Sequence, residues 1–167
     1  MQRFTCPVCG NRHDDLPVYT FEGPAFWKAA DAETRARDFK LGTDLCEYKD
    51  EHFLIRGRLP VMITDSPGDT LEFGVWVAIS RDNFERYRDT HLDDAPSTLG
   101  VFYGWLANAI PGYEDTVNLK VQVQPQGFGL RPFFAFVPDR EHELVRQQQD
   151  GITLDEAMRW LHERGGF

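Results

Sequence analysis

Residues 52–79 read HFLIRGRLPVMITDSPGDTLEFGVWVAI, and their pattern predicts two of the strands of a sheet. Apolar, β-branched and aromatic residues dominate both halves, which is typical of strands. The turn signal Asp65-Ser66-Pro67-Gly68-Asp69 separates the halves, and Pro60 indicates an edge or a bulge. A third strand-like segment, residues 44–48, precedes them after a turn at 49–51. Because these connections are too short for crossover helices, the three segments are predicted to form an antiparallel meander.

The rest of the chain adds strands and helices to this meander. Further strands are predicted over residues 99–106, 117–123 and 131–137, and residues 91–98 are expected to form a loop. Helices are predicted over 24–38, after an N-cap at Ser80, over 139–149, and after the capping box of Thr153 and Glu156. We therefore expect one α+β domain over residues 1–167, with an antiparallel sheet and flanking helices.

Composition narrows the class of protein. The chain is 41% hydrophobic and 27% charged, which is typical of an ordered globular domain. Its net charge of −9 repels phosphate backbones, so we expect no nucleic-acid partner. No apolar run is long enough to cross a bilayer, and the first residues do not resemble a secretory leader. We expect a cytoplasmic protein with no membrane partner.

The stretch Phe4-Thr5-Cys6-Pro7-Val8-Cys9-Gly10 indicates a metal site. Two thiols two residues apart can both point inward from one tight loop, and the glycine that follows relieves backbone crowding. Three cysteines, an odd number, do not make a disulfide scaffold. We expect residues 1–16 to form a zinc knuckle that packs on the rest of the domain.

The remaining ligands of a tetrahedral zinc site must come from elsewhere. His13 lies four residues beyond Cys9, and Cys46 is the third thiol, so a structural site of Cys6, Cys9, His13 and Cys46 is predicted. The alternatives stay open. Cys46 is also compatible with a buried small hydrophobe, and His52 or Asp44 can take the place of His13. A redox role for the two thiols is disfavoured because Gly10-Asn11 is a poor helix start.

The chain resembles a bacterial family known only as a domain of unknown function, number 2199. The resemblance runs over nearly the whole chain, and Glu143 stands where the family pattern has proline. It rests on Cys6-x-x-Cys9-Gly10-x-x-His13, Asp44-Leu45-Cys46, Arg56-Gly57, Phe73-Gly74-Val75-Trp76-Val77, Gly104-Trp105-Leu106, Leu119-Lys120, Arg131-Pro132, His142-x-Leu144 and Gln148-x-x-Gly151-Ile152. The resemblance implies a shared fold and a metal cluster, and it implies no activity.

Two classes of function follow from these observations. The favoured one is a binding or protein-interaction module, because the motifs anchor a metal and include no recognisable nucleophile elbow, phosphate loop or His-Glu-x-x-His helix. An acidic surface suits a basic protein partner. The alternative is a small-molecule hydrolase, or another enzyme, with a cleft around Arg131 and His142. The simpler interpretation of these two residues is that Arg131 binds an acid or the backbone and His142 caps a helix.

Overall fold

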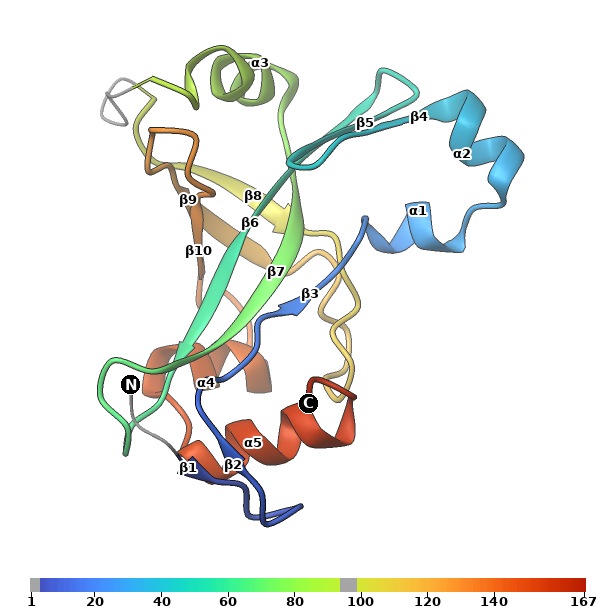
Figure 1. The fold of residues 1–167 in the computed structure, drawn as a ribbon. Coiled ribbons are helices and arrows are strands. Elements are labelled where there is room, and N and C mark those ends of the chain that lie inside the picture. The colour runs from blue at the N-terminus through green and yellow to red at the C-terminus, as the bar shows by residue number, and fades with distance from the viewer. Residues whose placement is uncertain (1–3, 94–98) are drawn as a thin grey trace.

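The long hairpin predicted over residues 52–79 forms the centre of the structure (Figure 1). The computed structural model describes residues 4–93 and 99–167, so part of the loop expected at 91–98 and residues 1–3 of the predicted knuckle lie outside them. Strand β6 (His52–Met62) pairs antiparallel with β7 (Thr70–Ile79) from Phe53↔Ile79 to Met62↔Thr70. The pairing of β5 (Leu45–Tyr48) with β6 completes the meander and confirms that prediction.

The sheet closes into a barrel of five strands, which corrects the expectation of a simply antiparallel sheet. Antiparallel pairs join β7 to β8 (Phe102–Leu106), β8 to β9 (Lys120–Gln124), and β9 to β10 (Phe133–Phe136). Strand β10 then returns to β6 as a parallel neighbour, at Phe133↔Arg58. Gly57 permits this close approach, because a side chain there would collide with Phe134.

Short strands extend the sheet beyond the five strands of the barrel. Strand β3 (Tyr19–Thr20) runs parallel to β7, and β4 (Phe39–Leu41) pairs antiparallel with β5. A separate two-stranded sheet consists of β1 (Phe4–Thr5) and β2 (Arg12–His13). Residues 117–119 were expected in a strand, but Asn118 has a left-handed φ of 71°, and β9 begins after it.

Residues 24–38 form two short helices rather than the single helix predicted. Helix α1 (Ala25–Ala29) ends at Ala30, whose ψ of 147° is extended. Helix α2 (Ala32–Asp38) begins anew because the carboxylate of Asp31 accepts a hydrogen bond from the backbone N–H of Thr34. Together with the β4–β5 hairpin, the two helices project to one side of the barrel as an arm, residues 25–48 (Figure 1).

The remaining helices cover the two ends of the barrel (Figure 1). Helix α3 (Arg81–Thr90) begins at the predicted Ser80 cap, and α5 (Leu154–Glu163) begins at the predicted capping box. Helix α4 (Glu143–Asp150) begins later than predicted, with His142 as its N-cap. No helix in residues 4–93 and 99–167 is long and apolar enough to cross a membrane.

Three hydrophobic clusters hold these parts together. The largest fills the barrel and includes side chains of α3, α4 and α5. A second lies under the arm and is built on Phe39, Cys46, Leu54, Trp76 and Ala107. The third is small: Phe4 and Cys6 of the N-terminal hairpin pack on Met158 of α5. The N-terminal segment is therefore attached to a helix by few apolar contacts.

Candidate metal centre

The N-terminal hairpin folds its two thiols into one loop. Backbone hydrogen bonds join Cys6 N–H to the Asn11 carbonyl at 2.8 Å, and Gly10 N–H to the Cys6 carbonyl at 2.9 Å. Gly10 has a φ of 73°, in the left-handed region that glycine adopts without strain. Gly10, which was predicted to relieve backbone crowding after the second cysteine, therefore has a backbone conformation that favours glycine.

The Cys6 side chain is buried and its charge is supported by the loop backbone. Its sulfur accepts a hydrogen bond from Val8 N–H at 3.4 Å. Burial on its own raises the pKa of the Cys6 thiol, but hydrogen bonds from the backbones of Cys9 and Val8 and from the Cys9 side chain together lower it below the ordinary value. A thiol of lowered pKa supplies the thiolate that a metal needs as a ligand.

Helix α5 brings a third ligand to the two thiols. Ligand atoms of Cys6, Cys9 and His162 all lie within 4.8 Å of one another. The Nδ1 atom of His162 is buried and has no hydrogen-bond partner among the described residues. An unpaired polar atom in a buried position costs free energy unless something binds it, and a metal ion between the sulfurs would do so. The donor set therefore fits a metal.

His13, the predicted third ligand, lies at the edge of this group. Its Nε2 is 3.6 Å from the sulfur of Cys9, and its ring stands against Phe167 with 3.9 Å between ring centroids. It is not within the mutual 4.8 Å set that His162 joins. His13 therefore contacts one of the three grouped residues without belonging to the group.

Cys46, the predicted fourth ligand, lies in a different part of the molecule. It is on β5, fully buried against Phe39, Leu54 and Trp76 in the cluster under the arm. Burial, with a smaller contribution from Glu47, raises the pKa of its thiol to about 12. The structure does not bring Cys46 to Cys6 and Cys9, and its surroundings match the alternative interpretation of a small buried hydrophobe.

The other two residues considered as ligands also have different partners. Asp44 accepts a hydrogen bond from Arg131 Nε at 2.7 Å. The His52 ring stacks on Tyr48 with 5.7 Å between centroids. Neither joins the group of Cys6, Cys9 and His162, which is the group of metal-ligating side chains found in the described part of the chain.

The residues of the predicted enzyme cleft serve separate structural roles. Arg131 forms an ion pair with Asp44. His142 accepts the backbone N–H of Leu144 at 3.1 Å as the α4 cap, and its Nε2 contacts the Glu114 carbonyl. The Gln148 amide binds the backbones of Pro60, Phe134 and Phe136. These are the simpler roles considered for Arg131 and His142 from the sequence.

His162 was missed because its distance along the chain from the thiols hides it. One signal was present: Met158 and His162 are four residues apart in a predicted helix, so they share a face. Met158 packs on Cys6 in the structure. The face of α5 that packs on the N-terminal hairpin through Met158 therefore also places His162, one turn later, beside that hairpin.

Comparison with known proteins agrees with the resemblance noted above. The chain belongs to the family DUF2199, described as an uncharacterized protein conserved in bacteria, and the family model matches residues 5–152. Cys6 and Cys9 lie within that match, and His162 lies beyond it. Neither the curated proteins nor the solved structures contain a match to this chain.

Proposed function

We propose that this protein is a binding module with a structural zinc site formed by Cys6, Cys9 and His162, with His13 as the fourth ligand. The observation that carries the zinc proposal is the convergence of one ligand atom each from Cys6, Cys9 and His162 within 4.8 Å. Two thiolates and two imidazoles form a common tetrahedral set for structural zinc. This assignment replaces Cys46 with His162.

The metal would join the N-terminal hairpin to the C-terminal helix. Within residues 4–93 and 99–167, the hairpin has two paired positions, and its small apolar cluster consists of Phe4, Cys6 and Met158 with the partly buried Leu16 and Leu154. A segment this small does not bury enough surface to offset the cost of ordering it. Bonds from both ends of the chain to one ion would supply the missing stability, as is usual for small zinc-binding segments.

Metal content in variants of the ligands tests the zinc site. We expect about one zinc ion per purified chain in the wild type and in Cys46→Ser, since Cys46 lies in another cluster. Cys9→Ser should lose the ion, and His162→Gln should weaken zinc affinity about tenfold or more in competition with a chromogenic chelator. Loss of zinc from Cys46→Ser, or unchanged affinity in His162→Gln, would overturn the assignment.

The same proposal assigns the barrel surface to a protein partner. Tyr103 and Trp105 of β8 are 49% and 44% exposed, and Lys120 of β9 lies over the Tyr103 ring at 4.9 Å. Large aromatic side chains that stay exposed on a rigid sheet are typical anchors of protein interfaces. The net charge of −9 favours a basic partner over nucleic acid.

The proposal also includes a cytoplasmic location, because reducing conditions there keep the thiols available as zinc ligands.

Association with the products of neighbouring genes tests the binding module. We expect one of these proteins, of basic charge, to bind in isothermal titration, and Trp105→Ala to weaken that binding about tenfold or more. Phe128→Ala is the control, because Phe128 is 63% exposed but lies outside the β8–β9 surface. Equal losses in both variants, or no association with any neighbouring product, would count against the module.

A further inference from the structure

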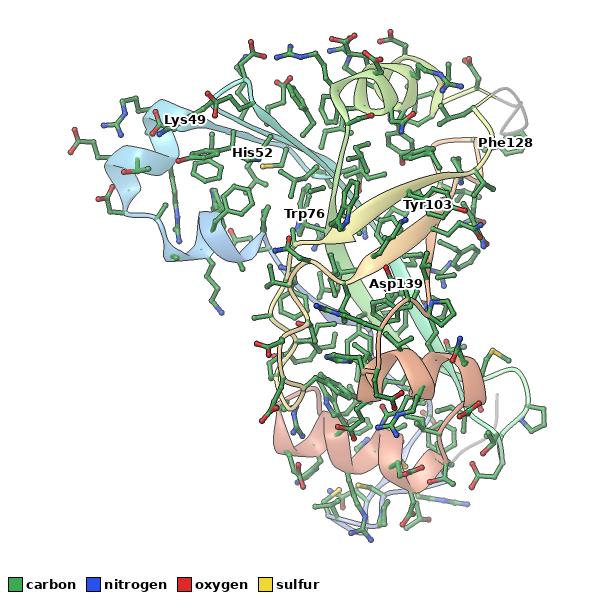
Figure 2. The ribbon with its side chains drawn as sticks, turned by 180° about the vertical axis from the view of Figure 1, so that it is seen from behind. Lys49, His52, Trp76, Tyr103, Phe128 and Asp139 are labelled. Carbon is green, nitrogen blue, oxygen red and sulfur yellow. The ribbon has the colours of Figure 1, made fainter. Side chains whose placement is uncertain are left out.

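A cavity of about 450 Å³ lies between the arm and the outside of the barrel. This volume is within the range of small-molecule sites. Figure 2 shows His52, one of its lining residues, beside the arm and on the same side of the molecule as Lys49. The lining residues come from α1, α2, β4, β5, β6, β7 and the segments around 107 and 117, and they are Ala25, Phe26, Ala30, Thr34, Phe39, Tyr48, His52, Ala78, Ala107, Val117 and Asn118.

The cavity exists because the arm covers the second hydrophobic cluster without filling it. Neither α1 nor α2 has a fully buried residue, and only the partly buried Trp27 and Ala30 of this segment pack on the second cluster. Four of the lining side chains are alanine methyl groups, at positions 25, 30, 78 and 107. Small side chains on both sides of the gap thus leave room that larger apolar residues would occupy.

Aromatic rings form one wall of the cavity. Phe26 stacks on Phe39 with 5.5 Å between centroids, and Phe39 lies 4.4 Å from Tyr48. Tyr48 in turn stacks on His52 at 5.7 Å. Phe26 remains 38% exposed at the edge of this group. Ring faces and edges presented in this way favour a flat aromatic molecule, which can stack or meet them edge-on.

Three of the residues that line the cavity carry polar side-chain groups. Within the described residues, the hydroxyl of Tyr48, the imidazole of His52 and the side-chain amide of Asn118 make no hydrogen bond to the rest of the chain. None of the lining residues is Lys, Arg, Asp or Glu. The Lys49 ammonium lies 5.2 Å from the centroid of the Tyr48 ring, but Lys49 does not line the cavity. A lining with hydrogen-bonding groups and no charged side chain favours an uncharged ligand with one or two polar atoms.

We propose that the cavity under the arm binds a small, flat, uncharged aromatic compound that carries a hydroxyl or ring-nitrogen group. The four alanine residues leave room for such a compound, and the rings of Phe26, Phe39 and Tyr48 contact its face. Tyr48, His52 and Asn118 bind its polar atom. This site is separate from the proposed zinc centre and from the proposed partner surface, and the inference rests on neither.

A matched pair of probes tests the chemistry of the ligand. 2-Naphthol and its saturated counterpart decahydro-2-naphthol have the same carbon skeleton and hydroxyl group, but only the first is flat and aromatic. We expect saturable binding of 2-naphthol to the full chain, with NMR shift changes at Ala30, Ala78 and Ala107. The saturated compound should bind about tenfold more weakly. Equal binding of the two, or no saturable binding of 2-naphthol, would overturn the proposal.

Two variants locate the site, and a third controls for them. Ala30→Leu places a larger side chain in the cavity and should weaken 2-naphthol binding about tenfold or more. Phe26→Ala removes a ring that is 38% exposed at the edge of the aromatic wall and should weaken 2-naphthol binding several-fold. Ala29→Leu adds the same side chain one residue earlier, at an exposed position that does not line the cavity, and should change nothing. Equal affinity of the Ala30→Leu and Ala29→Leu proteins, both shown folded by circular dichroism, would refute the location.

Discussion

At the scale of single residues, Gly57 decides whether the barrel can close. It lies on β6 beside Arg58, whose backbone N–H donates to the Pro132 carbonyl at 2.9 Å where β10 meets β6. A Cβ atom at position 57 would be 2.5 Å from Cε2 of Phe134 and 2.7 Å from the oxygen of Pro132. Neither neighbour can give way easily, because Phe134 is fully buried and the oxygen belongs to the backbone.

The prediction is that Gly57→Ala destabilises the protein by about 1–3 kcal/mol, the usual cost of overpacking a core. Urea unfolding monitored by tryptophan fluorescence measures the change. Gly42→Ala is the matched control, because the nearest atom to a Cβ there is the Leu45 oxygen at 3.4 Å and the position is exposed. Its stability should stay within about 0.5 kcal/mol of the wild type. Equal losses in both variants would show that closure does not depend on position 57.

Residue-level reasoning from the sequence found the thiol pair and placed His13 beside it, but it chose Cys46 where the structure brings His162. Cys6, Cys9 and Gly10 are adjacent in sequence, so spacing alone predicts their loop. The choice of Cys46 relied on counting thiols, and a count does not say which side of the sheet a strand residue faces. In the register of the structure, Cys46 pairs with Leu54 on the face that supports Trp76. The N-terminal hairpin, which carries Cys6 and Cys9, packs on Met158 of α5 instead.

At the scale of elements, α5 shows how local chemistry sets a boundary. Thr153 Oγ1 accepts the N–H of Glu156 at 3.3 Å, and the Glu156 carboxylate accepts the N–H of Thr153 at 2.7 Å. Hydrogen bonds from the Thr153 backbone and side chain hold the pKa of Glu156 below its ordinary value. The capping box was predicted because both partners lie within one turn.

The prediction is that Thr153→Ala costs about 1 kcal/mol at neutral pH, whereas Thr153→Ser, which keeps the hydroxyl, costs little. Since the folded pKa of Glu156 is lowered, its contribution is present above the ordinary pKa and is lost as the pH falls through the lowered value. The gap between wild type and Thr153→Ala should therefore narrow in acid. Urea titrations at neutral and acidic pH measure this, and a gap that widens in acid would contradict it.

Elements that depend on distant partners were predicted less well. The β6–β7 hairpin follows from residues next to each other in the chain, and it is as expected. The parallel closure of β10 on β6 rests on one bridge, Phe133↔Arg58, between segments far apart in sequence. Alternation within either strand contains no information about that pairing. The break at Ala30-Asp31 did have a local signal, the Asp31 cap, inside a pattern that otherwise predicts a continuous helix.

At the scale of the whole molecule, the three hydrophobic clusters differ in size and in the elements that they join. The barrel cluster includes long strands and fully buried side chains such as Phe73 and Leu59. The N-terminal hairpin has the smallest cluster and depends on the proposed zinc site. Helix α5 contributes to the barrel cluster and to the N-terminal cluster, because Trp160 and Leu161 pack in the barrel while Met158 packs on the N-terminal hairpin. Zinc should therefore affect one end of the molecule.

The prediction is that zinc removal loosens that end and leaves the barrel unchanged. With zinc removed by a chelator, amides of the hairpin, including those of Cys6 and Gly10, should exchange about tenfold faster or more in native-state hydrogen exchange. Amides along the β6–β7 ladder should keep their protection, because their bonds are covered by the barrel cluster. The last turn of α5, around His162, should respond less than the hairpin, since Leu161 is anchored in the barrel.

Cys9→Ser and Cys46→Ser separate the effect of zinc from that of losing a thiol. Cys9→Ser should reproduce the exchange pattern of the chelated wild type without any chelator, because it removes a proposed ligand. Cys46→Ser should leave the hairpin protected and instead speed exchange near β5, where a buried apolar thiol becomes a hydroxyl without a hydrogen-bond partner. Faster exchange spread evenly over barrel and hairpin after chelation would mean that the ion supports the whole fold rather than one attachment.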